Sequence, residues 1–134
     1  SDGGYSWSQP VQITDPMQHP GDLILLSNGD VLLVYGNRTP PYRIEGRISR
    51  DGGHTWLDCL LTFSGHLYGY AAVGERTTDL GYPSSVVRQG RGITLYYYLP
   101  SIDRRAWTAH DVQGYYAVAV VWDEAELLAA VKGV

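Results

Sequence analysis

A hexapeptide that occurs twice constrains the fold of this chain more than any other feature. Residues 2–7 read AspGlyGlyTyrSerTrp, and 49 positions later residues 51–56 read AspGlyGlyHisThrTrp. A repeat of about 50 residues, rich in Gly, Trp and Tyr and separated by short apolar runs, is typical of β-propellers, in which each blade is a sheet of four antiparallel strands. We therefore predict an all-β fold whose repeating unit is a propeller blade.

The second copy also matches a motif of a known family. Its pattern SxDxGxTW is formed by Ser49, Asp51, Gly53, Thr55 and Trp56, and the first copy keeps Asp2, Gly4, Ser6 and Trp7. This pattern resembles the Asp-box of the sialidase (neuraminidase) superfamily, and the resemblance implies part of a six-bladed propeller. In such a hairpin the Asp accepts backbone N–H bonds, Gly takes positive φ and Trp folds back over the turn. We expect the Asp and Trp of the motif to be structural.

The length of the chain is short for a whole propeller. At 134 residues the chain is less than half of what six blades of this period require. We expect either the C-terminal portion of a longer protein or a unit that completes its ring with further copies through open blade edges.

The predicted layout contains one complete blade and parts of others. We expect residues 1–14 to be the outer strand of an incomplete blade, 15–64 a complete blade, 65–122 a three-stranded blade and 123–134 a helix. The expected strands are 23–27, 31–35, 44–50, 56–63, 84–88, 93–98 and 115–122, each bounded by turn residues. The helix is expected over 123–132, with Asp123 as N-cap, Glu126 in a capping box and Gly133 as stop.

Composition excludes several classes of function. The net charge of −4 and the pI near 5.4 argue against nucleic acid binding, which needs a clustered basic surface. No apolar run approaches the length of a membrane span of about 18 residues or more, so we expect a soluble chain without membrane contact. Cys59 is the single cysteine, which leaves no internal disulfide and no Cys-based metal site. The compartment stays open.

Topology sorts the connecting segments onto two faces. In an up-and-down blade, the Asp-box turns lie on one face, and residues 15–22, 36–43, 64–83 and 99–114 lie on the other. In sialidases this second face carries the active site, and long loops on a rigid scaffold are where function tends to lie.

Tyr82 is the candidate nucleophile on that face. The stretch 79–86, AspLeuGlyTyrProSerSerVal, precedes a Gly turn and IleThrLeuTyrTyrTyr. It resembles the late sialidase segment in which a Tyr precedes Ser and an apolar strand, and the resemblance implies Tyr82 as the nucleophile of a glycoside hydrolase. A Tyr hydroxyl with a pKa near 10 needs a carboxylate base. Where the family places that Glu, this chain has Tyr97 or Tyr98.

The other candidates surround the same face. They are Asp79 as acid/base, Arg38 and Arg76 as residues that bind a substrate carboxylate, and His19 and Asp22 as further substrate contacts. His19, Asp22 and His66 have no metal-ligand spacing, and we expect neither a metal nor a cofactor. The structural alternatives are that Tyr82 plugs the end of a blade, that Asp79 caps a turn, and that Arg43, Glu45 and Arg47 form a cross-strand ion-pair network.

The function that these residues indicate is carbohydrate processing by a sialidase-like glycoside hydrolase or a relative of it. The alternative is a non-catalytic propeller that binds glycan or protein on the same face, and a third possibility is an inactive fragment. A carboxylate at about 2.6 to 3.2 Å from the Tyr82 hydroxyl would favour the enzyme.

Overall fold

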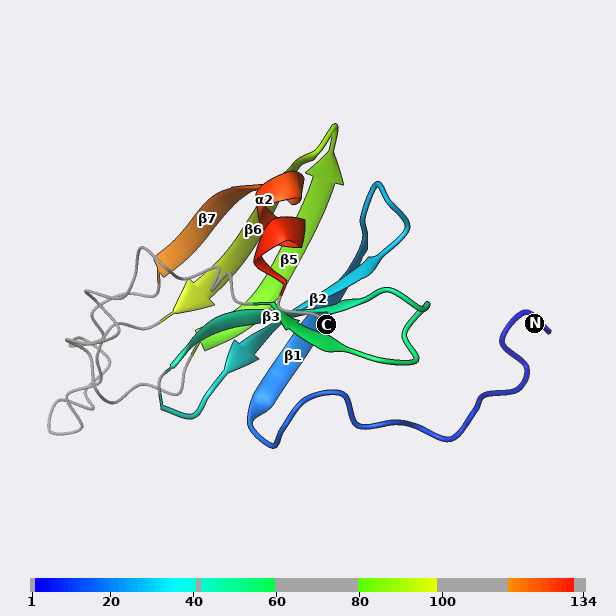
Figure 1. Cartoon of the computed structure of the whole chain (residues 1–134). Helices are drawn as coiled ribbons and strands as arrows, with labels where there is room; N and C mark the ends of the chain where they lie inside the picture. The colour runs from blue at the N-terminus through cyan, green and yellow to red at the C-terminus, as the bar shows by residue number, and fades with distance from the viewer. Residues whose placement is uncertain (1, 41, 60–79, 99–115, 132–134) are drawn as a thin grey trace, which may run out of the picture.

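The chain folds into two antiparallel β-sheets and one short helix, as seen in a computed structural model that describes residues 2–40, 42–59, 80–98 and 116–131 (Figure 1). Sheet A has the strand order β1-β2-β3-β4, and sheet B has the order β5-β6-β7. The strands of sheet A are β1 (Gln18–Leu25), β2 (Val31–Asn37), β3 (Arg43–Ser49) and β4 (Leu57–Cys59). Those of sheet B are β5 (Leu80–Arg88), β6 (Arg91–Tyr98) and β7 (Tyr116–Asp123). The all-β class is confirmed.

The seven strands fall where the apolar runs and turn residues predict them. Gln89 and Gly90 have φ of 54° and 77°, the geometry of a two-residue type I′ turn, and they join β5 to β6. The first strand of each sheet begins earlier than predicted. Strand β1 begins at Gln18 instead of residue 23, and β5 begins at Leu80 instead of residue 84. Both carry a bulge near that end, between Gln18 and Gly21 and between Gly81 and Ser84. The part of the fourth predicted strand beyond Cys59 lies outside the described residues.

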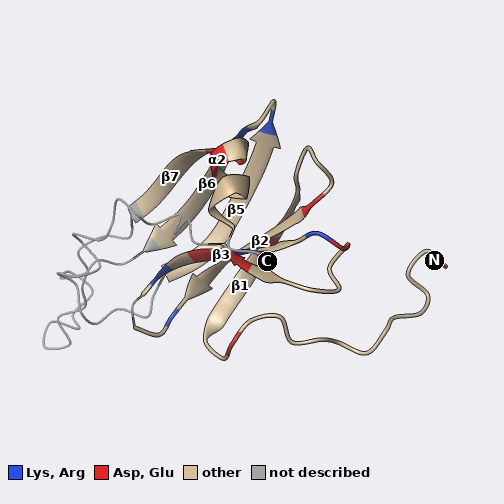
Figure 2. Ribbon diagram, in the orientation of Figure 1, with Lys and Arg blue, Asp and Glu red and all other residues tan. Residues whose placement is uncertain are grey.

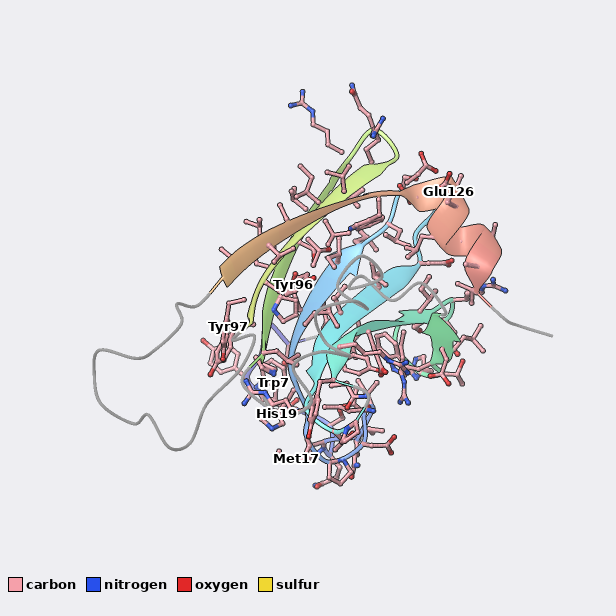
Figure 3. The ribbon with its side chains drawn as sticks, turned by 90° about the vertical axis from the view of Figure 1, so that its left-hand side faces the viewer. Trp7, Met17, His19, Tyr96, Tyr97 and Glu126 are labelled. Atoms are coloured by element: carbon pink, nitrogen blue, oxygen red, sulfur yellow. The ribbon has the colours of Figure 1, made fainter. Side chains whose placement is uncertain are left out.

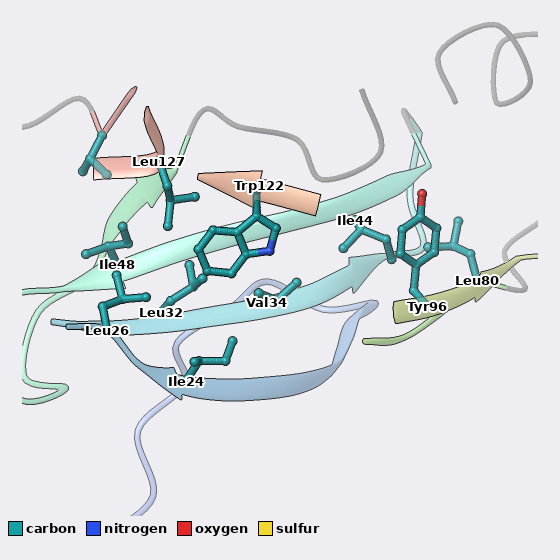
Figure 4. Close-up of a cluster of buried hydrophobic side chains, with 11 residues drawn as sticks. Ile24, Leu26, Leu32, Val34, Ile44, Ile48, Leu80, Tyr96, Trp122 and Leu127 are labelled. Atoms are coloured by element: carbon teal, nitrogen blue, oxygen red, sulfur yellow. The ribbon is translucent and has the colours of Figure 1, made fainter. Parts of the chain in front are cut away.

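The core lies between the two sheets, which pack face to face. Strand β5 contacts both β1 and β2. The close-up in Figure 4 shows aliphatic side chains of sheet A meeting Trp122, Tyr96 and Leu80 of sheet B. The buried aliphatic residues of sheet A and its β1–β2 turn are Ile24, Leu26, Leu32, Val34, Ile44 and Ile48. In β1 and β3 the buried positions alternate with more exposed ones, so that one face of these strands is buried, whereas β2 is buried on both faces.

Helix α2 (Glu124–Ala130) follows β7 directly and closes one end of the core. Its N-cap is Asp123 as predicted, whose side chain accepts hydrogen bonds from the backbone N–H groups of Ala125 (2.9 Å) and Glu126 (3.2 Å). Leu127 is buried in the inter-sheet core. Among the described residues, no helix is long and apolar enough to cross a membrane.

Glu124 ties the helix to the opposite sheet. It is 2% exposed, and its Oε1 accepts hydrogen bonds from the backbone N–H of Ser27 at 2.6 Å and from the Ser27 hydroxyl at 2.7 Å. The Glu124 N–H donates to the carbonyl of Gly90 at 2.8 Å. One carboxylate therefore joins the β1–β2 turn to α2, and the helix backbone reaches the β5–β6 turn.

The two Asp-boxes adopt the same local structure. In the second box, the Thr55 hydroxyl and N–H donate to the Asp51 carboxylate, and these bonds, with that from Ser49, lower the pKa of Asp51. The Trp56 indole donates to the carbonyl of Gly53 at 3.1 Å, as the Trp7 indole does to that of Gly4 at 3.0 Å. Both boxes are thus hairpin turns held by their own residues.

The segment after the first box differs from the prediction. Residues 5–14 were expected to form an outer strand, but no part of residues 2–17 is a strand, and Trp7 is 88% exposed. Figure 1 shows this segment extending away from both sheets. A strand without a neighbour leaves its N–H and C=O groups unpaired, so only the local box turn forms.

Trp56→Ala is expected to lower the free energy of unfolding by about 1 to 2 kcal/mol, because the ring is only partly buried. Trp7→Ala removes the same side chain from the same kind of turn without a sheet behind it, and should change the free energy of unfolding by less than about 0.5 kcal/mol. Urea unfolding of the monomer at high dilution measures both. Equal losses would show that the box, rather than its packing on sheet A, determines the effect.

Candidate functional site

Three sequence-predicted residues lie at one end of the two sheets. Arg38 follows the last residue of β2, His19 lies near the start of β1, and Tyr82 lies near the start of β5. Asp51 follows the other end of β3 and lies at the opposite end of the sheets. Figure 3 shows His19 and Tyr97 toward the same end, away from Glu126 of α2. The sheets therefore separate the candidate site from the second Asp-box.

Tyr82 protrudes from the bulge of β5 in a conformation that non-glycine residues rarely adopt. Its φ is 49°, that of the preceding Gly81 is 129°, and its side chain is 64% exposed. A bulky residue in the left-handed region is strained, and such strain is concentrated at functional sites. The bulge directs a large aromatic side chain into solvent instead of into the sheet interface.

Tyr97 completes an aromatic pair with Tyr82. The two ring centroids lie 5.6 Å apart with an angle of 34° between the planes. This contact follows from register, because Tyr97 on β6 pairs with Gly81 on β5. The family resemblance indicates only that Tyr97 or Tyr98 stands where sialidases have a Glu. It does not predict that Tyr97 packs against the Tyr82 ring.

Arg38 lies beside this pair. Its guanidinium carbon is 5.9 Å from the centroid of the Tyr82 ring, within the range of a cation–π contact. Its Nε donates to the carbonyl of Leu80 at 3.1 Å, and its backbone N–H donates to the carbonyl of Met17 at 2.9 Å. Arg38 thus has a structural role, and its guanidinium is held against Tyr82.

A glycine contact brings the strands together at this end. A Cβ on Gly36 of β2 would lie 3.0 Å from the Cα of Gly81 and 3.4 Å from the carbonyl oxygen of His19. A side chain at Gly36 would crowd this approach of β1, β2 and β5, so glycine favours it. The aromatic pair and Arg38 are therefore placed by backbone packing between the sheets.

Asp22 is not part of the aromatic group. Its Oδ2 accepts a hydrogen bond from the backbone N–H of Ser85 at 2.6 Å, which ties β1 to β5. The Ser85 hydroxyl is 2.9 Å from that of Thr94, which also accepts a hydrogen bond from the Trp122 indole at 3.0 Å. Asp22 therefore serves inter-sheet packing in this structure, a role that the sequence did not reveal. The His19 side chain is exposed.

The predicted ion-pair network forms on the face of sheet A turned away from sheet B. Glu45 accepts hydrogen bonds from the Tyr35 hydroxyl (3.1 Å), from Asn37 Nδ2 (3.1 Å) and from Arg43. Arg47 lies within 3.0 Å of Asp58 and over the Tyr35 ring. Burial, followed by the charge of Glu45, raises the pKa of Tyr35. Arg47 also donates a hydrogen bond to the carbonyl of Ile13, and none of these contacts reaches Tyr82.

The described residues contain no carboxylate hydrogen-bonded to the Tyr82 hydroxyl, and no group of His, Cys, Asp and Glu among them could hold a metal ion. Asp79, Arg76 and His66 lie outside the described residues. What this part of the chain provides is an aromatic pair, with Tyr82 exposed and Tyr97 half-buried, flanked by a cation, a surface suited to stacking and to anionic groups.

Comparisons with family models, with curated proteins and with solved structures returned no match to this chain.

Proposed function

We propose that this chain is part of a sialidase-like β-propeller and that the end carrying Tyr82, Tyr97 and Arg38 binds carbohydrate. The observation that carries the proposal is Tyr82 itself, an exposed aromatic residue held at a φ of 49° by a bulge, next to a second ring and a guanidinium. The bulge serves the backbone contact between Gly36 and Gly81, but it also directs the Tyr82 ring into solvent, where the ring is available to a ligand.

The arrangement of the sheets supports the propeller part of the proposal. Two antiparallel sheets pack face to face with their first strands, β1 and β5, in contact, and both of these strands bulge at the same end. An Asp-box joins β3 to β4 in sheet A, as expected of the third and fourth strands of a blade.

Binding is better supported than hydrolysis by the described residues. A sugar presents C–H groups that pack on aromatic rings, and Tyr82 and Tyr97 together offer such a surface. Arg38 would favour a sugar that carries a carboxylate. The hydrolytic form of the proposal assigns Tyr82 as nucleophile and Asp79 as acid/base, and it requires a base for the Tyr82 hydroxyl.

Saturation-transfer NMR with a sialoside and with a neutral oligosaccharide tests the proposal. Tyr82→Ala is expected to weaken sugar binding about tenfold, since it removes one aromatic contact worth roughly 1 to 1.5 kcal/mol. Tyr82→Phe keeps the ring and should bind like the wild type. Ser84→Ala, an exposed position on the same strand, is the matched control.

A fluorogenic sialoside assay on the same proteins distinguishes binding from hydrolysis. Turnover in the wild type that disappears in Tyr82→Phe would establish the hydrolase. Absence of any sugar binding by the wild type, or equal binding by Tyr82→Ala, would contradict the proposed site.

A further inference from the structure

The exposed apolar side chains of this chain gather on three surfaces. Large hydrophobic residues that are 42% to 95% exposed occupy eleven positions among the described residues. Nine of them fall into three sets: Tyr5, Trp7 and Val11; Leu23 and Leu25; and Val86, Ile93, Leu95 and Val121. Met17 and Tyr82 are the other two. This concentration is unlike the single scattered apolar residues of an ordinary surface, and contiguous apolar patches mark interaction sites.

The first surface is the outer face of sheet B, turned away from sheet A. Val86, Ile93 and Val121 lie in one cross-strand row of β5, β6 and β7, and Leu95 lies between Ser84 and Ala119 in the next. Between the ends of these strands Figure 2 shows no charged residue. It is a neutral, apolar sheet face of the kind that packs on another sheet.

The second surface is the outer face of β1, at the edge of sheet A and on the opposite side of the molecule from the first surface. On the same side of sheet A, β3 and β4 carry the ion pairs Arg43–Glu45 and Arg47–Asp58. Leu23 and Leu25 alternate along β1 with Ile24, which faces the core between the sheets. Inside the chain, β1 and β2 meet β5 through their inner faces. The outer face of β1 is therefore placed to meet a further sheet in the same way.

The third surface is the N-terminal arm, defined as residues 2–14. It begins with a folded Asp-box, and in sheet A the residues after such a box form the fourth strand, β4, paired with β3. In the arm the residues after the box pair with no strand. Sheet B has three strands and β7 is the last of them in the described part of the chain.

We propose that copies of this chain associate head to tail. The outer face of sheet B of one copy packs on the outer face of sheet A of the next, and the arm of that next copy pairs along β7 as the fourth strand of sheet B. The occupant is a second copy because both halves of the interface are present on one chain, on opposite sides, and because the arm directly precedes the sheet whose face it would accompany.

Head-to-tail contacts form either closed rings or open filaments. Within the chain, sheet B packs on one face of sheet A. In the proposed association, sheet B of one copy packs on the other face of sheet A of the next copy. If the fold is the six-bladed propeller proposed above, a closed ring contains three repeats of the pair of sheets that the described residues form. The association itself does not depend on sugar binding at Tyr82.

Mass measurement by light scattering and analytical ultracentrifugation tests this association on the full chain. Leu25→Glu alters the outer face of sheet A, and Leu95→Glu alters that of sheet B. Each should raise the dissociation constant about 100-fold or more, because a carboxylate would be buried without a partner. Ala129→Glu on the exposed side of α2 is the matched control and should assemble like the wild type.

Mixing the two variants provides the decisive result. Leu25→Glu retains an intact sheet B face and Leu95→Glu an intact sheet A face, so a mixture should form a pair of one copy of each, although neither variant self-associates. In hydrogen exchange, amides of residues 8–14 should become protected on assembly and remain unprotected in Leu25→Glu alone. A wild-type monomer up to millimolar concentration, a mixture that forms no pair, or an assembly with unprotected arm amides would overturn the proposal.

Discussion

Replacing Gly92 by alanine is expected to destabilise the chain by about 3 kcal/mol or more, although it adds a single methyl group. A Cβ at this position would lie 2.1 Å from an atom of the Trp122 ring, with two further ring atoms within 2.5 Å. The indole is 8% exposed and donates a hydrogen bond to Thr94, so it cannot move aside without leaving the core. The expected loss approaches that of removing a buried Trp, about 3 to 5 kcal/mol.

A double-mutant cycle shows whether the clash is the cause. In a Trp122→Ala background the ring is gone, and Gly92→Ala should then cost less than about 1 kcal/mol. Gly21→Ala is the matched strand control, because the nearest atom to its Cβ, at 2.8 Å, is the flexible end of Leu33. Urea unfolding followed by circular dichroism gives all four values. A loss in Gly92→Ala no larger than in Gly21→Ala would contradict the packing described for sheet B.

Local sequence features predicted much of the fold. The Asp-boxes and the Asp123 cap depend on hydrogen bonds between residues at most four positions apart, which spacing alone reveals. The strand positions were predicted from short apolar runs bounded by turn residues. These features involve residues close together in the sequence, so the sequence alone predicts them.

Contacts between distant segments were not readable from the sequence. Asp22 was expected to contact substrate, yet it accepts a hydrogen bond from Ser85, and Glu124 binds Ser27 across the core. Tyr97 lies beside Tyr82 because β6 pairs with β5 over this stretch, a register that the sequence does not reveal. In the N-terminal arm the sequence pattern predicts a strand, but none forms, because a strand needs a hydrogen-bonding partner and neither sheet provides one there.

Leu127→Ala is expected to lower the free energy of unfolding by about 2 to 5 kcal/mol, because this side chain of α2 is completely buried in the cluster between the sheets. Figure 4 shows it above Ile48 and beside Trp122. Sheet A continues after its third strand into an Asp-box and β4, whereas sheet B continues after β7 into α2. Leu127 therefore fills the core between the sheets at the end that α2 closes.

Leu128→Ala is the matched control for this prediction. It makes the same substitution at the next position of the same helix, so the change in helix propensity is the same and cancels in the comparison. Leu128 is only partly buried, and its loss should cost about 1 kcal/mol. Chemical denaturation of the two variants at one protein concentration measures the difference. Equal losses would mean that α2 lies on the surface of sheet B and contributes little to the core, whereas a larger loss at Leu127 makes the helix a structural element of the two-sheet unit.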